Sequence, residues 1–300
     1  MERKNCFYCK LPSDLYRKSS NKQIGKNFNF ASTEVDTYVS EIKPDLYFCK
    51  ECQIIFSEFV DKKFQDNYKD VLDNLYIEQI ENKKKYFKNI INKLSSIITS
   101  EDDVLEIGSY YGAFGSQIKK KVRSYTGLEL SKHASKFARD NFNLKIENKS
   151  IYDFFDNPLK KFDIIFMFDV IEHLDDPDEI LKLCSKNLKN NGKMIISTMN
   201  MDSIFAKVTR SYYPWIIPMH KFYFTNHSIK KFLNRNNMTL NKILMDIRII
   251  SLEYLFLKIS QKIIFFKFFY KILVKFKLLK NLSIKFTLFD INIYVASKFK

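Results

Sequence analysis

Short apolar segments alternate with amphipathic ones between residues 103 and 200, and this alternation constrains the fold more than any other feature of the 300-residue sequence. Apolar runs predict strands at residues 103–107, 124–130, 144–146, 162–168 and 193–198, with helices between them. Apolar strands separated by helices indicate a parallel sheet with both faces covered. We therefore expect an α/β, Rossmann-like sheet, closed by an antiparallel strand near residues 286–296.

The loop after the first strand contains Gly108, Gly112 and Gly115 and precedes a helix. Glycine permits a tight turn and a close approach of the backbone to a ligand. Glu106 lies in the strand before the loop, and Glu129 follows the next strand, 21 residues after Gly108. A carboxylate at the position of Glu129 can accept hydrogen bonds from a ribose diol.

Two kinds of ligand, a dinucleotide and S-adenosylmethionine, are compatible with a glycine-rich loop in this position. A dinucleotide fingerprint needs glycine two positions after Gly108, where this chain has Tyr110. An acid directly before the loop also suits a cation better than a pyrophosphate. S-adenosylmethionine carries a sulfonium and an ammonium and no phosphate, so the loop favours that cofactor.

Four motifs occur in order: Leu-Glu-Ile-Gly-Ser-Tyr-Tyr-Gly at 105–112, Gly-Leu-Glu-Leu-Ser at 127–131, the segment 162–177 with Asp-Val-Ile-Glu-His, and the helix–turn–strand element 187–198. This order resembles the class I S-adenosylmethionine-dependent methyltransferases, including the ubiquinone-type O-methyltransferases. The resemblance implies cofactor binding by Glu106, Gly108, Gly112, Glu129, Ser150, Ile151 and Asp169. An ordinary α/β domain with a glycine-rich turn, and a binding fold without catalysis, are the alternatives.

Four of the five cysteines form two Cys-x-x-Cys pairs, Cys6 with Cys9 and Cys49 with Cys52. Residues 1–12 carry no apolar export signal, so these pairs favour metal ligation over disulfides and indicate a cytoplasmic protein. Four thiolates complete a tetrahedral zinc set, which makes the expected zinc structural. Four free thiols are the alternative, and Cys184 is expected in the core.

A Cys-rich module before a cofactor domain resembles methyltransferases of bacterial sugar and surface-polysaccharide pathways. In the sugar C-methyltransferases that residues 218–225 resemble, a Glu-His pair supplies the base. His220 matches that histidine, but Met219 stands in the Glu position, which favours a hydroxyl acceptor. His173 is the second candidate base because it follows the fourth strand, at the ligand-binding edge of such sheets.

The ubiquinone branch suggests another role for the segment after the fourth strand. There, an acid-x-x-Glu-His cluster binds a divalent metal, and Asp169, Glu172 and His173 match its residue types. The alternative is structural, with Glu172 and His173 capping the next helix.

The excess positive charge lies in the last third of the chain. The whole chain carries 50 basic and 34 acidic residues, net +16, whereas residues 201–300 carry 18 basic and 4 acidic, net +14. Lysines recur through an aromatic segment at 249–285, which predicts two short helices. These helices either cap the pocket, form a dimer face, or lie on an anionic membrane at its inner face.

Together these patterns divide the chain into a zinc module at 1–60, a helical linker at 61–100, a cofactor domain at 101–200 and a substrate-covering region at 201–300. We expect methyl transfer to a small molecule or glycan precursor, such as a nucleotide- or lipid-linked sugar. An RNA methyltransferase is the alternative, disfavoured because no Asn/Asp-Pro-Pro-Tyr/Phe motif follows the fourth strand. The third alternative is a non-catalytic protein that binds cofactor and zinc.

Overall fold

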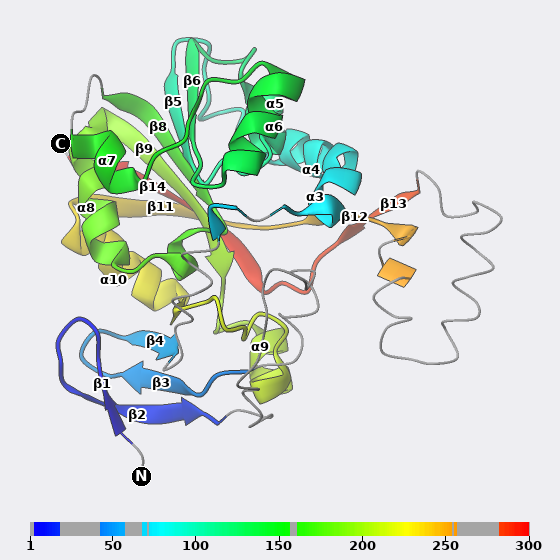
Figure 1. The fold of residues 1–300 in the computed structure, drawn as a ribbon. Helices are drawn as coiled ribbons and strands as arrows, with labels where there is room; N and C mark the ends of the chain where they lie inside the picture. The colour runs from blue at the N-terminus through cyan, green and yellow to red at the C-terminus, as the bar shows by residue number, and fades with distance from the viewer. Residues whose placement is uncertain are drawn as a thin grey trace.

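A computed structural model of the chain describes residues 3–18, 43–57, 68–70, 72–156, 161–253, 255–256 and 282–299. Within these residues the protein consists of a large sheet covered by helices, a small sheet below it and a two-stranded ribbon at one side (Figure 1). None of the described helices combines the length and apolar character that crossing a membrane requires.

The large sheet carries the core of the molecule. Its seven strands, in spatial order, are β11 (Met238–Met245), β14 (Ile291–Lys298), β9 (Leu188–Met199), β8 (Phe162–Phe168), β5 (Asp103–Ile107), β6 (Ser124–Leu128) and β7 (Ile146–Glu147). The strands from β9 to β7 are parallel, and β14 and β11 are antiparallel additions. The predicted fold class is confirmed, although the closing strand begins later than expected, at Ile291.

Helices cover both faces of this sheet (Figure 1). The described helices are α3 (Asn74–Glu78), α4 (Ile80–Lys93), α5 (Ala113–Ile118), α6 (Lys132–Phe142), α7 (Ile151–Asp156), α8 (Pro177–Asn187), α9 (Ile204–Thr209) and α10 (Asn226–Arg235), with 3₁₀ turns η2 (Ile171–His173) and η3 (Arg210–Tyr212). Alternate residues of β8 serve opposite faces, because Ile164 and Phe166 pack with α4 and α5 while Ile165 and Met167 pack with α8 and α10. Cys184 of α8 is buried in the core, as predicted.

The small sheet combines the N-terminal module with a distant segment. Its order is β1 (Arg3–Asn5), β2 (Pro12–Arg17), β3 (Leu46–Cys49), β4 (Ile54–Ser57) and β10 (Phe222–Tyr223). The antiparallel pairing of β10 with β4 was not expected from the sequence. Because β10 directly follows Lys221, the Cys-rich module is attached to the segment predicted to cover the substrate.

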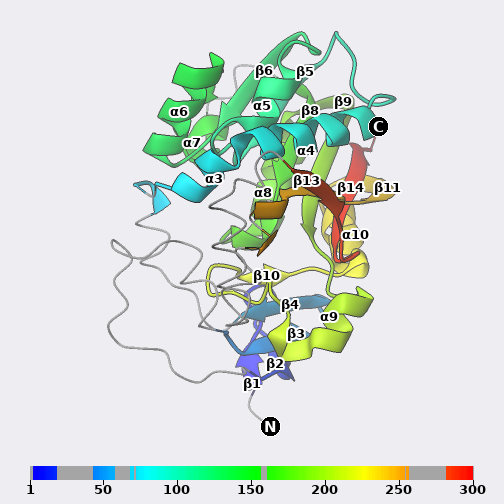
Figure 2. The same ribbon diagram turned by 90° about the vertical axis from the view of Figure 1, so that its right-hand side faces the viewer.

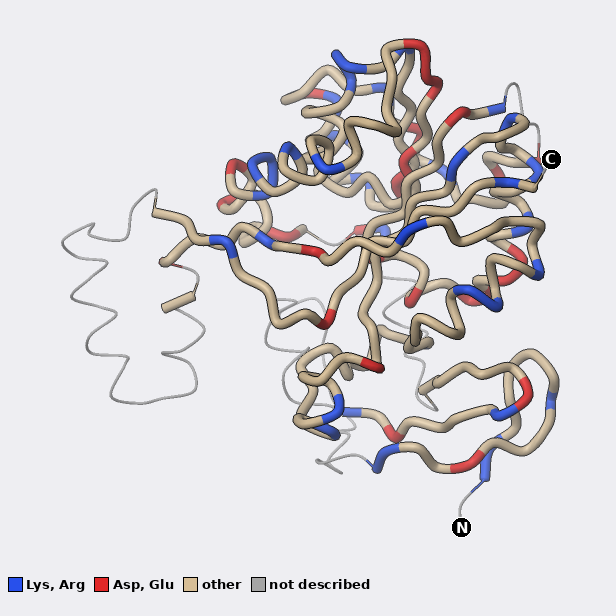
Figure 3. Tube along the Cα trace, turned by 180° about the vertical axis from the view of Figure 1, so that it is seen from behind, with Lys and Arg blue, Asp and Glu red and all other residues tan. Residues whose placement is uncertain are grey.

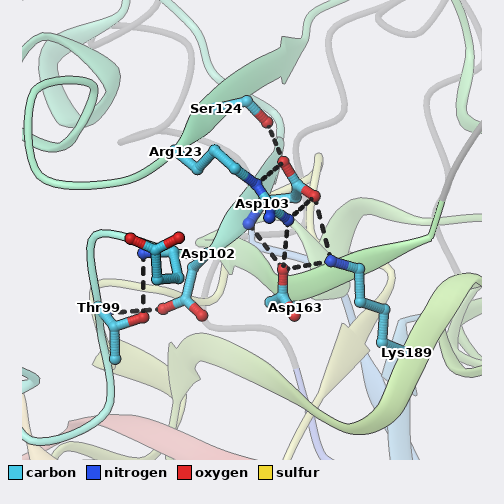
Figure 4. Close-up of polar contacts among 8 residues, drawn as sticks. Thr99, Asp102, Asp103, Arg123, Ser124, Asp163 and Lys189 are labelled. Atoms are coloured by element: carbon cyan, nitrogen blue, oxygen red, sulfur yellow. Dashed lines mark hydrogen bonds and ion pairs between the residues drawn. The ribbon is translucent and has the colours of Figure 1, made fainter.

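The amino ends of the parallel strands are held by a charged cluster (Figure 4). The Asp103 carboxylate accepts hydrogen bonds from Arg123, from Ser124 Oγ at 2.6 Å and from Lys189 Nζ at 3.1 Å. Lys189 also bonds Asp163 at 2.7 Å, which connects β5 with β8. This edge is opposite the carboxyl ends of the strands, so the cluster serves the fold rather than the site.

The basic aromatic segment is described only at its ends. Arg248–Ser251 (β12) pairs antiparallel with Ser283–Phe286 (β13), where the sequence predicted helix. The pairing joins positions more than 30 residues apart, and such long-range pairing cannot be predicted from local spacing. Lys258, Lys262, Lys267, Lys271, Lys275, Lys277 and Lys280 lie outside the described residues.

The first testable consequence concerns the turn after β5. Gly108 has φ +75°, and a Cβ there would collide with Val170 Cγ2. We expect Gly108→Ala to lower the free energy of unfolding by about 1–2 kcal/mol for the left-handed backbone, and further for the collision. Urea unfolding measures this, with the exposed Lys120→Ala as a control that changes stability by less than about 0.5 kcal/mol. A Gly108→Ala protein as stable as the control would show that the turn tolerates a side chain.

Candidate functional site

A cavity of about 650 Å³ lies at the carboxyl edge of the parallel strands. Its walls come from the β5–α5 loop, the ends of β6 and β8, residues 149–152, helix α4, strand β12 and the segment 218–221. Ligands of open α/β sheets bind at this edge, and the volume is ordinary for a small-molecule site. The cavity brings together most of the predicted site residues.

The glycine loop forms the floor of the cavity. Glu106 and Gly108 both line it. The Glu106 carboxyl is buried and accepts a hydrogen bond from the Tyr125 hydroxyl, and burial raises the pKa of Glu106 well above its usual range. Gly112 does not line the cavity. It has φ +77° at the start of α5, and a Cβ there would lie 2.8 Å from Ala138 Cβ, so this glycine lets the loop pack on α6.

Glu129 is held at the cavity wall by backbone donors. Its Oε2 accepts from the Tyr110 amide at 2.8 Å, and its Oε1 accepts from the Ser131 amide at 2.7 Å. The Tyr68 hydroxyl also bonds this carboxyl. Burial raises the pKa of Glu129 to about 7, against the lowering effect of these hydrogen bonds. These hydrogen bonds fix the orientation of the Glu129 carboxylate. Further hydrogen-bond donors, such as the hydroxyls of a diol, would stabilise its charged form.

The remaining predicted cofactor positions also line the cavity: Ser150, Ile151 and Asp169. Asp169 has the unusual φ of +52°, and its amide donates to Ser197 O at 3.0 Å. Its Oδ1 accepts from Ser197 Oγ at 2.9 Å and its Oδ2 from Arg248 Nη2 at 2.6 Å. The carboxylate of Asp169 is therefore fixed by β9 and β12.

The two candidate bases lie against each other, with ring centroids 4.6 Å apart. His173 lines the cavity, and His220 is buried behind it. His173 Nδ1 lies 3.1 Å from Met219 O, and His220 Nδ1 lies 2.8 Å from Trp215 O. Because a carbonyl oxygen only accepts, Nδ1 carries the proton in each ring and Nε2 keeps a lone pair.

Burial keeps both rings neutral. It lowers the pKa of His173 to about 4, and it lowers the pKa of His220 well below the usual range. Glu172 adjoins them, with ligand atoms of the three side chains within 4.8 Å of one another. Asp169 is not in this group, so the structure does not bring together the acid-x-x-Glu-His set as the sequence suggested.

The four cysteines form the other cluster. Their sulfur atoms lie within 4.8 Å of one another, with Cys9 Sγ 3.5 Å from Cys49 Sγ. The two pairs have the same local geometry. The residue after each pair has positive φ, and its amide donates to the carbonyl of the first cysteine: Lys10 to Cys6 at 3.1 Å and Gln53 to Cys49 at 2.8 Å.

Sequence reasoning missed the residues that α3, α4 and β12 contribute. Tyr76, Lys83, Tyr86 and Arg248 line the cavity, and burial lowers the pKa of Lys83 to about 8, with Arg248 adding to the effect. A signal was available for Lys83, because it stands four residues before Phe87 on the apolar stripe of α4. No local signal marked Arg248, whose place depends on the pairing of β12 and β13.

Comparisons with known proteins identify the family to which this domain is similar. A family model described as a methyltransferase domain matches residues 76–242, more than half of the chain. A ubiquinone biosynthesis O-methyltransferase of Pelagibacter ubique is 29% identical over 179 residues, covering 53% of this chain and 72% of that protein. A protein of the same name from Erwinia tasmaniensis is 24% identical over 138 residues, covering 43% and 55%. Several further relatives of that name are matched over less than two thirds of their length.

Among solved structures, the N-methyltransferase NodS of Bradyrhizobium japonicum WM9 in complex with S-adenosyl-l-homocysteine has a TM-score of 0.50 at 13% identity. The match covers 79% of this chain and 99% of NodS. At this identity the likeness shows the fold alone.

The raised pKa of Glu129 predicts pH-dependent cofactor affinity. Donors from a ribose diol favour the carboxylate, so binding of S-adenosylhomocysteine should strengthen about tenfold from pH 6 to pH 8 as a group of pKa about 7 loses its proton. Glu129→Gln should remove most of this dependence and weaken binding at pH 8 by about 1.5–3 kcal/mol. Equilibrium dialysis across this pH range measures both effects. Unchanged affinity of the variant at pH 8 would remove Glu129 from the cofactor site.

Proposed function

The chain belongs to the methyltransferase-domain family and is an S-adenosylmethionine-dependent methyltransferase, and we propose that its acceptor is a hydroxyl on a small molecule or glycan precursor. The observation that carries the proposal is the neutral His173 at the cavity wall, with the neutral His220 packed against it. A hydroxyl needs a proton acceptor during methylation, and a neutral imidazole with a free lone pair supplies one.

The residues at the floor of the cavity fit the cofactor. Glu129 offers fixed carboxylate oxygens, and Gly108 exposes backbone in a tight turn where no side chain intervenes. Glu106, Ser150, Ile151 and Asp169 would complete the binding surface. S-adenosylmethionine supplies an activated methyl group on a sulfonium, so positioning of the acceptor accounts for most of the catalysis.

His173 is the proposed base, because it lines the cavity whereas His220 stands behind it. The Met219 carbonyl fixes the tautomer that leaves Nε2 of His173 able to take the proton. His220 supports the ring of His173 by edge-to-face contact and is in turn fixed by the Trp215 carbonyl. The Met219 carbonyl belongs to the segment 218–221 of the cavity wall, so the position of this segment also sets the orientation of the His173 ring.

A sugar linked to a nucleotide or a lipid is the acceptor that we favour. Lys69 and Lys149 are exposed residues of the cavity wall and can pair with phosphate at its mouth. The attachment of the Cys-rich module beside the acceptor segment supports the same choice, since the methyltransferases of sugar pathways that the sequence resembles carry such a module.

The proposed base gives a direct test. His173→Gln should reduce methyl transfer by about 10²–10⁴-fold and leave S-adenosylhomocysteine affinity within a factor of about two. Product S-adenosylhomocysteine is measured with a panel of nucleotide-linked sugars as acceptors. His133→Gln, an exposed substitution on α6, is the matched control and should be as active as wild type. If His173→Gln retained full transfer, the base would have to be another group.

We also propose that the four cysteines hold one structural zinc. Tetrahedral Zn–S bonds of about 2.3 Å place sulfurs about 3.8 Å apart, which the observed spacing accommodates. All four positions are protein ligands, so such a zinc would stabilise the module and take no part in catalysis.

Elemental analysis tests the zinc directly. Protein purified without chelator should contain one zinc per chain, and Cys49→Ser should release it and make the module sensitive to proteolysis. Cys184→Ser, at a buried cysteine outside the cluster, should retain the metal. Absence of zinc from the wild-type protein would mean that the cysteines are free thiols.

A further inference from the structure

Three large apolar side chains are exposed on α9 and η3, two of them on α9 and the third after the helix ends at Arg210, which has φ +48°. Ile204 is 82% exposed, Val208 73% and Tyr212 75%. The inner face of the same segment is buried, since Ala206 and Tyr213 pack against the Cys-rich module and the end of β9. Figures 1 and 2 both place α9 beside β3 and β4. The backbone that carries the exposed side chains is therefore held in place by the packing of its buried face.

Basic residues surround this apolar stripe. Lys207 and Arg210 are exposed between its members. The end of β2 adds two more, because Arg17 donates to Arg210 O at 2.9 Å and Ser211 Oγ donates to Lys18 O at 2.6 Å. Figure 3 shows basic positions where α9 and this end of β2 meet.

The sequence around the stripe contains few acids. No acidic residue occurs from position 203 to position 245, and the one acid at the start of α9 is Asp202. A surface of this charge repels a second copy of the same surface and attracts an anionic one.

The size of the stripe favours a lipid surface over a protein. A stable protein interface buries about 20–30 residues on each side, far more than three apolar side chains provide. Shallow insertion of a few apolar groups into a bilayer interface, with lysine and arginine at the headgroups, needs no larger area. Tyrosine suits that depth because its ring is apolar and its hydroxyl is polar.

We propose that Ile204, Val208 and Tyr212, together with Lys207 and Arg210, form a docking surface for an anionic membrane. The chain continues from this surface through Tyr213 to Pro218 and Met219 in the cavity wall. Docking there attaches the acceptor side of the cavity to the lipid interface. The inference does not depend on the identity of the acceptor or on the proposed base.

The test is co-sedimentation of the full chain with vesicles of phosphatidylcholine and phosphatidylglycerol at 3:1, without cofactor or acceptor. Wild-type protein should bind these vesicles and bind pure phosphatidylcholine at least tenfold more weakly. The triple variant Ile204→Ser, Val208→Ser, Tyr212→Ser should lose at least tenfold in partition coefficient. Lys207→Gln with Arg210→Gln should weaken binding severalfold at low salt and make little difference at 0.5 M salt, where charges are screened.

Matched control variants distinguish vesicle binding through this surface from non-specific binding. Leu11→Ser, Ile243→Ser and Phe299→Ser together remove three exposed apolar side chains elsewhere, and Lys120→Gln with Lys121→Gln removes two exposed charges. Both should bind vesicles like wild type. Thermal stabilisation by S-adenosylhomocysteine, unchanged in every variant, confirms that each is folded.

Three results would overturn the proposal. The first is wild-type protein that stays in the supernatant with anionic vesicles. The second is a triple variant that sediments like wild type, which would place the membrane contact on another part of the chain. The third is a triple variant that turns a wild-type dimer into a monomer in light scattering while vesicle binding is unchanged, which would make the stripe a contact between two copies.

Discussion

The architecture of the site depends on the tight turn that follows β5. Gly108 takes a left-handed conformation against Val170, and the chain can then place the Tyr110 amide on Glu129. That hydrogen bond joins the loop after β5 to the residue that follows β6. The carboxyl ends of these two strands, which form the floor of the cavity, are therefore held in a fixed relative position. A side chain at Gly108 would push the loop away from Val170, the residue that precedes η2 and the candidate base His173.

A second chain of contacts connects the Cys-rich module to the same site. The Ser57 amide at the end of β4 donates to Lys221 O at 2.9 Å, and the Lys221 amide donates to Glu172 O at 2.9 Å. Glu172 lies between β8 and the two histidines, and its carboxylate accepts from Thr198 Oγ1 at 3.0 Å. The Cys-rich module is therefore connected to the acceptor side of the cavity through backbone hydrogen bonds.

The sequence was most informative where function and fold depend on local patterns. The strand at 162–168, the glycine loop and Glu129 were predictable, because apolar runs and turn residues act over a few positions. Long-range pairings were not: β10 joins β4 across more than 160 residues, and β11 is half-exposed, without the apolar run of a buried strand. The position of Arg248 on Asp169 depends on such a pairing, as does the contact of His173 with His220. Gly112 was assigned to the cofactor from its motif, and the structure shows that this glycine also lets the loop pack closely on α6.

The central claim is that the cavity at the carboxyl edge binds S-adenosylmethionine. Titration calorimetry of the wild-type protein with S-adenosylhomocysteine, S-adenosylmethionine and NAD tests it most directly. The account predicts one saturable site per chain for S-adenosylhomocysteine, displaced competitively by S-adenosylmethionine, and no measurable heat with NAD. Binding of NAD with comparable affinity, or no binding of S-adenosylhomocysteine, would contradict the account.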